Sequence, residues 1–117
     1  MIKEELINFL EQKGYHSYPI PRFEDESIIW TGSKRLPEGS SKCDTNEHKI
    51  SYHIKIYNFK LHERCYSGLD VEIVANKHDQ WIILKSYGIS WEKVEKQLSI
   101  VEQCLLNAWE AIVKTKD

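Results

Sequence analysis

The feature that most constrains this fold is an apolar stripe in the last quarter of the chain. Between Trp91 and Lys114, apolar residues recur at alternating spacings of three and four, which is the period of one α-helix face. The stripe consists of Trp91, Val94, Leu98, Val101, Leu105, Ala108 and Ile112. Ser90 stands where it can cap the first turn. At about 1.5 Å per residue this helix is about 36 Å long, so the upstream residues must provide an apolar surface to match.

A shorter helix is predicted at the N-terminus. It should end near Lys13, because Gly14 can take the left-handed conformation that follows many helices. Its apolar face is formed by Ile2, Leu6, Phe9 and Leu10. A second, shorter stripe on the C-terminal helix consists of Leu106, Trp109 and Val113. We expect the N-terminal helix to cover it, and the alternative is a helix of a binding partner. Residues 15–23 contain two prolines and several aromatic residues, so they should form an extended connection that is pinned to the core.

Four segments with strand character lie between the two helices. They are residues 27–31, 50–57, 69–75 and 80–87. Matching of apolar and charged residues predicts an antiparallel register between the middle two segments, with Ile56 opposite Val71 and Lys55 opposite Glu72.

The same matching predicts how the last two strands pair. Ile73 should face Ile82, and Asp70 should face Lys85. The inward face would then be apolar throughout, and it would be formed by Tyr52, Ile54, Ile56, Val71, Ile73, Ile82 and Leu84.

These elements predict a single α+β domain over residues 1–117. The expected architecture is a two-layer sandwich with a four-stranded antiparallel meander sheet, in the order α-β-β-β-β-α, and both helices on one face. Residues 33–49 are rich in Pro, Gly, Ser, Asp and Asn, and we expect them to form a long exposed loop.

Charge and composition narrow the classes of function. The formal charge of the chain is -2, so there is no basic field of the kind that binds nucleic acid. We find no apolar segment typical of a signal peptide or membrane span, and we expect a cytoplasmic protein without membrane association. The three cysteines, Cys43, Cys65 and Cys104, are widely spaced and should be reduced. No close Cys or His pair indicates zinc, and we expect neither metal nor cofactor.

The outward face of the predicted sheet carries more apolar and aromatic residues than a solvated surface needs. Three arrangements would explain this: cover by the chain's own loops, a homodimer through this face, or a ligand groove. The candidate partner-binding residues are His53, Lys55, Tyr57, Val74, Trp81, Ile83 and, from the loop, Arg35.

An enzyme is the alternative interpretation. A metal-dependent hydrolase of nucleic acid needs carboxylates and a lysine around a divalent ion. Asp25 with Glu47 and Lys49 would offer one such set, and Asp70 with Glu72 another. However, Glu47-His48-Lys49 falls in the loop, and Asp70 and Glu72 have a simpler role in cross-strand pairing with lysines.

No set of residues forms a convincing catalytic constellation. The sequence therefore favours a non-enzymatic interaction module, such as an adaptor, inhibitor or immunity-type protein. It would bind a protein partner or a second copy of itself through the outer sheet face and the 33–49 loop.

Overall fold

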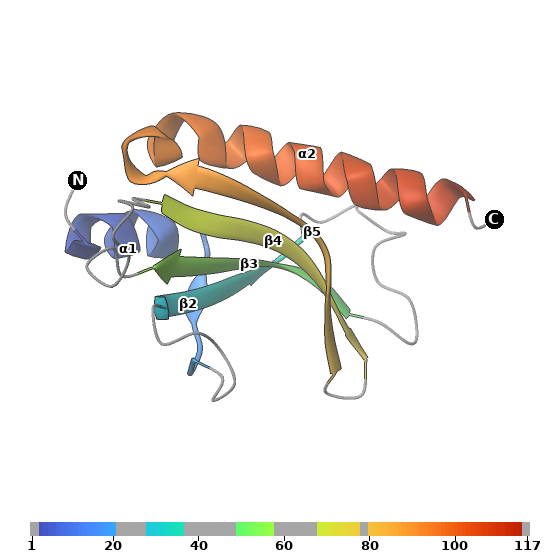
Figure 1. The fold of residues 1–117 in the computed structure, drawn as a ribbon, viewed down its shortest axis with the longest axis horizontal. Coiled ribbons are helices and arrows are strands. Elements are labelled where there is room, and N and C mark those ends of the chain that lie inside the picture. The colour runs from blue at the N-terminus through green and yellow to red at the C-terminus, as the bar shows by residue number, and fades with distance from the viewer. Residues whose placement is uncertain (1–2, 21–27, 37–48, 58–67, 78–79, 116–117) are drawn as a thin grey trace.

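The computed structural model describes residues 3–20, 28–36, 49–57, 68–77 and 80–115. They form an α+β fold in which two helices lie on the same face of an antiparallel sheet (Figure 1). The elements in chain order are α1 (Lys3–Gln12), β1 (His16–Ser17), β2 (Ile28–Arg35), β3 (Lys49–Tyr57), β4 (Gly68–Lys77), β5 (Gln80–Ser90), the 3-10 turn η2 (Trp91–Lys93) and α2 (Val94–Thr115).

The sheet has five strands rather than the four that the sequence predicted. Its order is β1-β2-β3-β4-β5 with every neighbouring pair antiparallel, so the meander prediction is confirmed. The added strand is β1, which pairs His16 with Ser33 and Ser17 with Gly32. A two-residue strand leaves no alternating pattern in the sequence, so only the pairing with β2 reveals it.

β2 is longer than predicted, and it takes in the start of the expected loop. The strand continues through Gly32 to Arg35, and β3 begins at Lys49. Gly32 was expected to end the strand, but it lies within β2 beneath the indole ring of Trp30. A Cβ atom at this position would lie 2.3 Å from that ring, so a larger residue here would force the ring to move. Residues 37–48 of the predicted loop lie outside the described residues.

The predicted registers between strands are wrong, although most faces were assigned correctly. Ile56 pairs with Leu69 rather than Val71, which is a shift of two residues. Because side chains alternate with a period of two, such a shift keeps every residue on its predicted face. The pairing of β4 with β5 differs more from the prediction, since Ile73 faces Lys85 rather than Ile82.

Both helices follow the sequence prediction closely. After α1, Tyr15 N donates to Leu10 O at 3.1 Å and Gly14 N donates to Glu11 O at 3.0 Å, which is the Schellman pattern. Gly14 has a φ of +98°, as predicted. At the start of the second helical segment, Ser90 is extended as an N-cap should be, but its side chain makes no capping hydrogen bond.

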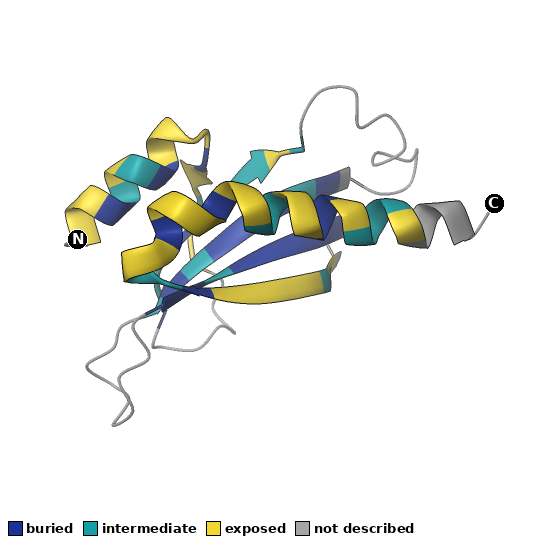
Figure 2. Cartoon of the chain, turned by 90° about the horizontal axis from the view of Figure 1, so that it is seen from above, coloured by how far each residue is buried: buried dark blue, intermediate teal, exposed yellow. Residues whose placement is uncertain are grey.

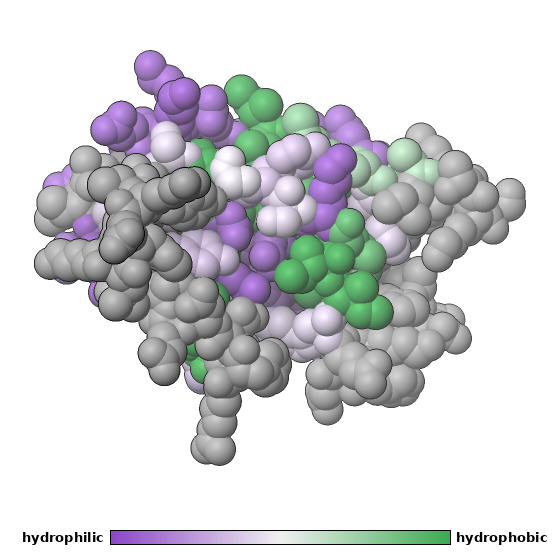
Figure 3. Space-filling model, in the orientation of Figure 1, coloured by the Kyte–Doolittle hydropathy of each residue, from purple (hydrophilic) through white to green (hydrophobic). Residues whose placement is uncertain are grey.

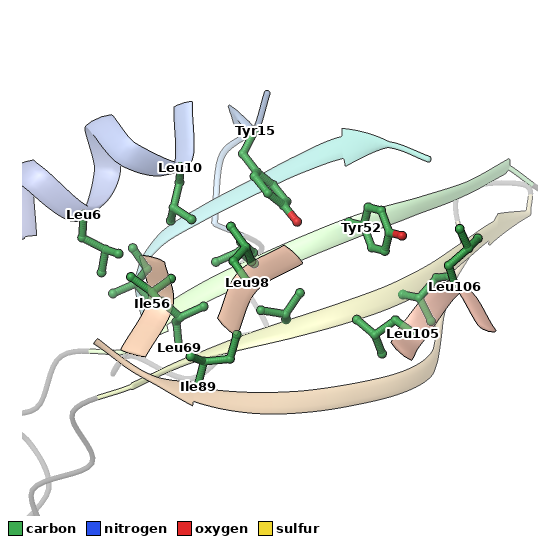
Figure 4. Packing of buried hydrophobic residues seen from close by; sticks show 14 of the residues in the cluster. Leu6, Leu10, Tyr15, Tyr52, Ile56, Leu69, Ile89, Leu98, Leu105 and Leu106 are labelled. Carbon is green, nitrogen blue, oxygen red and sulfur yellow. The ribbon is translucent and has the colours of Figure 1, made fainter. Parts of the chain in front are cut away.

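The core lies between α2 and the inner sheet face, which is the face that α1 and α2 cover. Figure 4 shows Leu98 and Leu105 of α2 directed at the sheet, with Leu6 and Leu10 of α1 at one end of the cluster. Leu106 is buried at the opposite end. The prediction that the first helix covers the stripe around Leu106 is therefore wrong, because α1 packs at the opposite end of the core.

A polar contact fixes α2 over the inner face. The Glu102 side chain accepts a hydrogen bond from the Tyr15 hydroxyl at 2.7 Å and forms an ion pair with Lys34, while its backbone carbonyl accepts from the Tyr52 hydroxyl at 2.9 Å. Lys34 Nζ also lies 4.9 Å from the centroid of the Tyr15 ring. Burial, and then the negative charge of Glu102, raise the pKa of Tyr15 above its ordinary value, so its hydroxyl remains a donor.

Two residues of α2 provide a matched test of this packing. Leu98 is 2% exposed and Ile100 is 62% exposed. We expect Leu98→Ala to lower the free energy of unfolding by about 2–5 kcal/mol, because it leaves a cavity against the sheet. Ile100→Ala should change it by less than about 0.5 kcal/mol. Urea denaturation followed by circular dichroism measures both, and equal losses in the two variants would contradict the assigned helix face.

Candidate functional site

The outer face of the sheet, opposite the helices, has a covered part and an open part. The register aligns its side chains in rows that cross the strands. Thr31, His53 and Glu72 in these rows are 1%, 6% and 4% exposed, although no helix covers them. The burial of three polar residues here shows that part of the face is closed by the chain itself.

The segment after β1 provides one piece of this cover. The chain passes around the β2 edge of the sheet, so that Tyr15 is buried in the inner core and Tyr18 contacts the outer face. Tyr18 N donates to Thr31 O at 3.2 Å, and Thr31 Oγ1 donates to Tyr18 O at 2.8 Å. For residues 15–20, the described part of the 15–23 connection, the prediction that its aromatic residues pin the chain to the core is therefore confirmed.

His53 lies at the centre of the covered part. Its Nδ1 is 2.9 Å from the Tyr18 hydroxyl, and its Nε2 is 2.9 Å from Ser51 Oγ. Its ring packs edge-on against the rings of Tyr18 and Trp81, with centroids 5.3 Å and 4.8 Å away. Burial, and then the positive charge of Lys55, lower the pKa of His53 to about 4. The imidazole is therefore neutral at pH 7 and holds the aromatic cluster together as an uncharged group.

The charged residues beside His53 have partners within the sheet. Lys55 Nζ lies 3.7 Å from Glu72 Oε1, and both side chains are mostly buried. The Tyr57 hydroxyl donates to Asp70 Oδ2 at 2.9 Å. The first contact supports the predicted pairing of Glu72 with Lys55, although the ion pair runs diagonally rather than directly across the strands. The predicted pairing of Asp70 with Lys85 is wrong, because Lys85 lies opposite Ile73 and Asp70 accepts from Tyr57 instead.

The open part begins at a β-bulge in β5. The ladder pairs Val74 with Ile83 and Ile73 with Lys85, so Leu84 is an extra residue without a partner position on β4. Before the bulge, Ile82 pairs with Ala75, and this places Ile82 on the inner face, where it remains 51% exposed.

Three consecutive apolar side chains are exposed at this end of β5. Trp81, Ile82 and Ile83 are 47%, 51% and 50% exposed, and we call them the hairpin patch. Figure 3 shows apolar side chains gathered over this stretch of β5. Figure 2 shows that β5 is the edge of the sheet and is exposed along most of its length. The sequence analysis had assigned Ile82 to the core. The sequence feature that could have revealed this exposed patch is the run from Trp81 to Leu84. The run is apolar without alternation, so it predicts apolar side chains on both faces of the strand.

The structure separates the seven predicted partner-binding residues into three groups. His53 and Val74 are buried and offer no surface to a partner. Lys55 and Tyr57 are half-buried and engaged with Glu72 and Asp70. The exposed ones are Arg35, Trp81 and Ile83.

Arg35 and Ile83 belong to the same row of the outer face. The register connects Arg35 to Ser51, Ser51 to Val74 and Val74 to Ile83. Three strand spacings of about 4.8 Å separate the two ends of this row by about 14 Å. An exposed cationic residue and an exposed apolar patch thus flank one continuous surface.

The structure describes only part of the residues of the alternative enzyme interpretation. Asp25 and Glu47 lie outside the described residues, and of Lys49 only the backbone is described. In the part of the chain that is described, no group of three His, Cys, Asp or Glu side chains could hold a metal ion. The hydrolase therefore remains a prediction from sequence alone.

Comparisons with protein-family models, with curated proteins and with solved structures found no match. Among the described helices, none has the length and apolar character needed to cross a membrane. The function must therefore be inferred from the surface itself.

The neutral state of His53 predicts how stability depends on pH. A histidine in the unfolded chain has a pKa of about 6.5, while that of folded His53 is about 4. The unfolded state binds more protons between these values, so the folded protein is fully stabilised above pH 6.5 and loses stability as the pH falls toward 4, by about 3 kcal/mol in total. We expect the Cε1 proton of His53 to titrate near pH 4 by NMR. In urea denaturation, lowering the pH from 6.5 to 5 should reduce the free energy of unfolding less in His53→Gln than in the wild type. An NMR titration midpoint near 6.5 for His53 would contradict the buried, neutral state.

Proposed function

We propose that this chain is a small cytoplasmic interaction module that binds a protein partner through the hairpin patch and the adjoining outer sheet face. The observation that carries the proposal is the exposure of three consecutive large apolar side chains on an edge strand. Removing apolar surface from water stabilises a protein by about 25 cal/mol per Å². The exposed surface of these three side chains contributes nothing of this kind to the fold, but it could stabilise a complex with a partner. Contiguous apolar patches on small proteins often mark sites where another molecule binds.

The patch is centred on a side chain that is already held in place. The Trp81 ring packs edge-on against Tyr18 and His53, with centroids 5.4 Å and 4.8 Å away, yet nearly half of the residue remains exposed. A partner that covers Trp81 therefore pays little further loss of side-chain freedom. Tryptophan is also among the residues that most often dominate binding energy in interfaces.

The surroundings of the patch fit the usual anatomy of a protein interface. Apolar residues occupy the centre, and the exposed Arg35 lies about 14 Å away at the end of the same row. Arg35 also belongs to the 33–49 segment that the sequence assigned to the binding surface. A partner with an apolar contact surface and an acidic group at this distance would complement both features.

A matched pair of cross-linking sites tests the proposal. Ile83 and Ile100 are both exposed isoleucines, but only Ile83 belongs to the patch. We expect p-benzoylphenylalanine at position 83, introduced in the cells that make this protein, to form discrete protein adducts on illumination. These adducts should be competed by excess unmodified protein, and the same reagent at position 100 should give none above background.

A surface variant provides the control for this experiment. Ile83→Ser in the unmodified competitor should reduce its ability to compete by about tenfold, equivalent to about 1.4 kcal/mol, whereas Ile100→Ser should leave competition unchanged. Adducts of equal yield and identity at positions 83 and 100 would overturn the proposal.

A further inference from the structure

β5 is an edge strand of the sheet. Within the described residues β5 pairs only with β4, and alternate residues of such a strand direct their backbone N–H and C=O groups away from the sheet. Proteins usually guard such edges with charge, proline or a covering element. The stretch from Trp81 to Leu84 contains neither charge nor proline, so its edge can accept another strand.

The β-bulge limits the length of strand that can be added. Gln80 to Ile83 pairs regularly with β4, and the irregularity at Leu84 interrupts the alternation. Within the regular stretch, Trp81 and Ile83 lie on the outer face and Ile82 lies on the inner face. A strand added here must therefore be short, and it must place apolar residues on both faces.

We propose that the occupant of this edge is a second copy of the same chain, paired antiparallel with Ile82 opposite Ile82 across a two-fold axis. This inference rests on the proposed function, since it uses the same patch. The axis places Trp81 of each copy opposite Ile83 of the other, so all four of these side chains share the outer face. Aromatic and β-branched residues are favourable cross-strand pairs. A shift of one residue would place outward residues opposite inward ones. A shift of two residues would keep the faces but would place Ile82 opposite Gln80 or Trp81 opposite Lys85, so only this register pairs all three patch residues with one another.

Charge and area are consistent with a weak, closed dimer. The net charge of -2 per chain causes little repulsion between copies, and no charged residue lies within the paired stretch. The exposed halves of the three patch side chains amount to roughly 300 Å² per copy, which is well below the roughly 800 Å² of a standard interface. The dimer should therefore form only at high concentration. Pairing of one edge with itself uses that edge in both copies, so the assembly ends at two chains.

Disulfide trapping tests this arrangement directly. In a background with Cys43, Cys65 and Cys104 replaced by serine, Ile82→Cys places two thiols opposite each other across the axis. Residues that face each other in antiparallel strands have Cα atoms about 4.5–5.5 Å apart, which is within the range of a disulfide. We expect mild oxidation of the full-length protein to yield a covalent dimer.

Two control positions make the test specific for register. Lys85 lies on the same strand, but the proposed axis separates its two copies by about 20 Å, and Ile100 is exposed on α2. Lys85→Cys and Ile100→Cys should form covalent dimer at least about tenfold more slowly than Ile82→Cys. Equal rates at positions 82 and 85, or no dimer at position 82 at high protein concentration, would overturn the inference.

The two proposals can fail separately. If position 83 forms adducts with a different protein while Ile82→Cys remains monomeric, the interaction module stands and self-pairing is wrong. If positions 83 and 100 give the same adducts and Ile82→Cys also remains monomeric, both proposals are wrong. Light scattering with the unmodified protein should show a mass that rises with concentration, and Ile83→Lys should abolish that rise.

Discussion

The contact between α2 and the inner face of the sheet is the interaction on which the rest of this structure depends. Leu98 and Leu105 are completely or almost completely buried against the inner face of the sheet, and this non-directional attraction fixes which face is inside. Direction comes from Glu102, which joins the helix to Tyr15, Lys34 and Tyr52. Because these partners come from the segment after α1, from β2 and from β3, one residue of the helix ties together elements far apart in the sequence. The hydrogen bonds and the ion pair of Glu102 are partly buried, and they set the orientation of α2 on the sheet, which apolar packing alone does not determine.

With both helices on one face, the other face must satisfy its own buried groups. Polar residues removed from water need partners, and His53, Thr31 and Glu72 find them in Ser51, Tyr18 and Lys55. This network reaches from β1 as far as the start of β5, where Trp81 closes the aromatic cluster. Further along β5, Ile82 and Ile83 are about half exposed, the first on the inner face and the second on the outer face. The β-bulge at Leu84 ends the stretch in which these exposed residues pair regularly with β4.

The candidate surface could be anticipated from the sequence only in part. The surplus of apolar residues around Trp81 and Ile83 was visible, because a solvated strand face has no use for them. Their neighbours His53 and Val74 could not be removed from the site, since their burial depends on Tyr18 and on strand pairings that local patterns do not contain. Ile82 was assigned to the core because alternation puts it on the inner face. The structure does place it there, opposite Ala75, but leaves it 51% exposed. Alternation predicts which face a side chain lies on, and it does not predict how far that face is covered.

The sequence by itself determined the two helices, the end of the first at Gly14, the meander of strands and the identity of the inner face. These follow from periods of 3.6 and 2 and from turn residues, which are properties of neighbouring positions. Only the tertiary structure decided the fifth strand, the registers, the path of the chain from Tyr15 to Tyr18, and which part of the outer face stays open. Each of these depends on contacts between distant residues, where a shift of two positions leaves the local pattern unchanged and only the packing of the whole sheet distinguishes the alternatives.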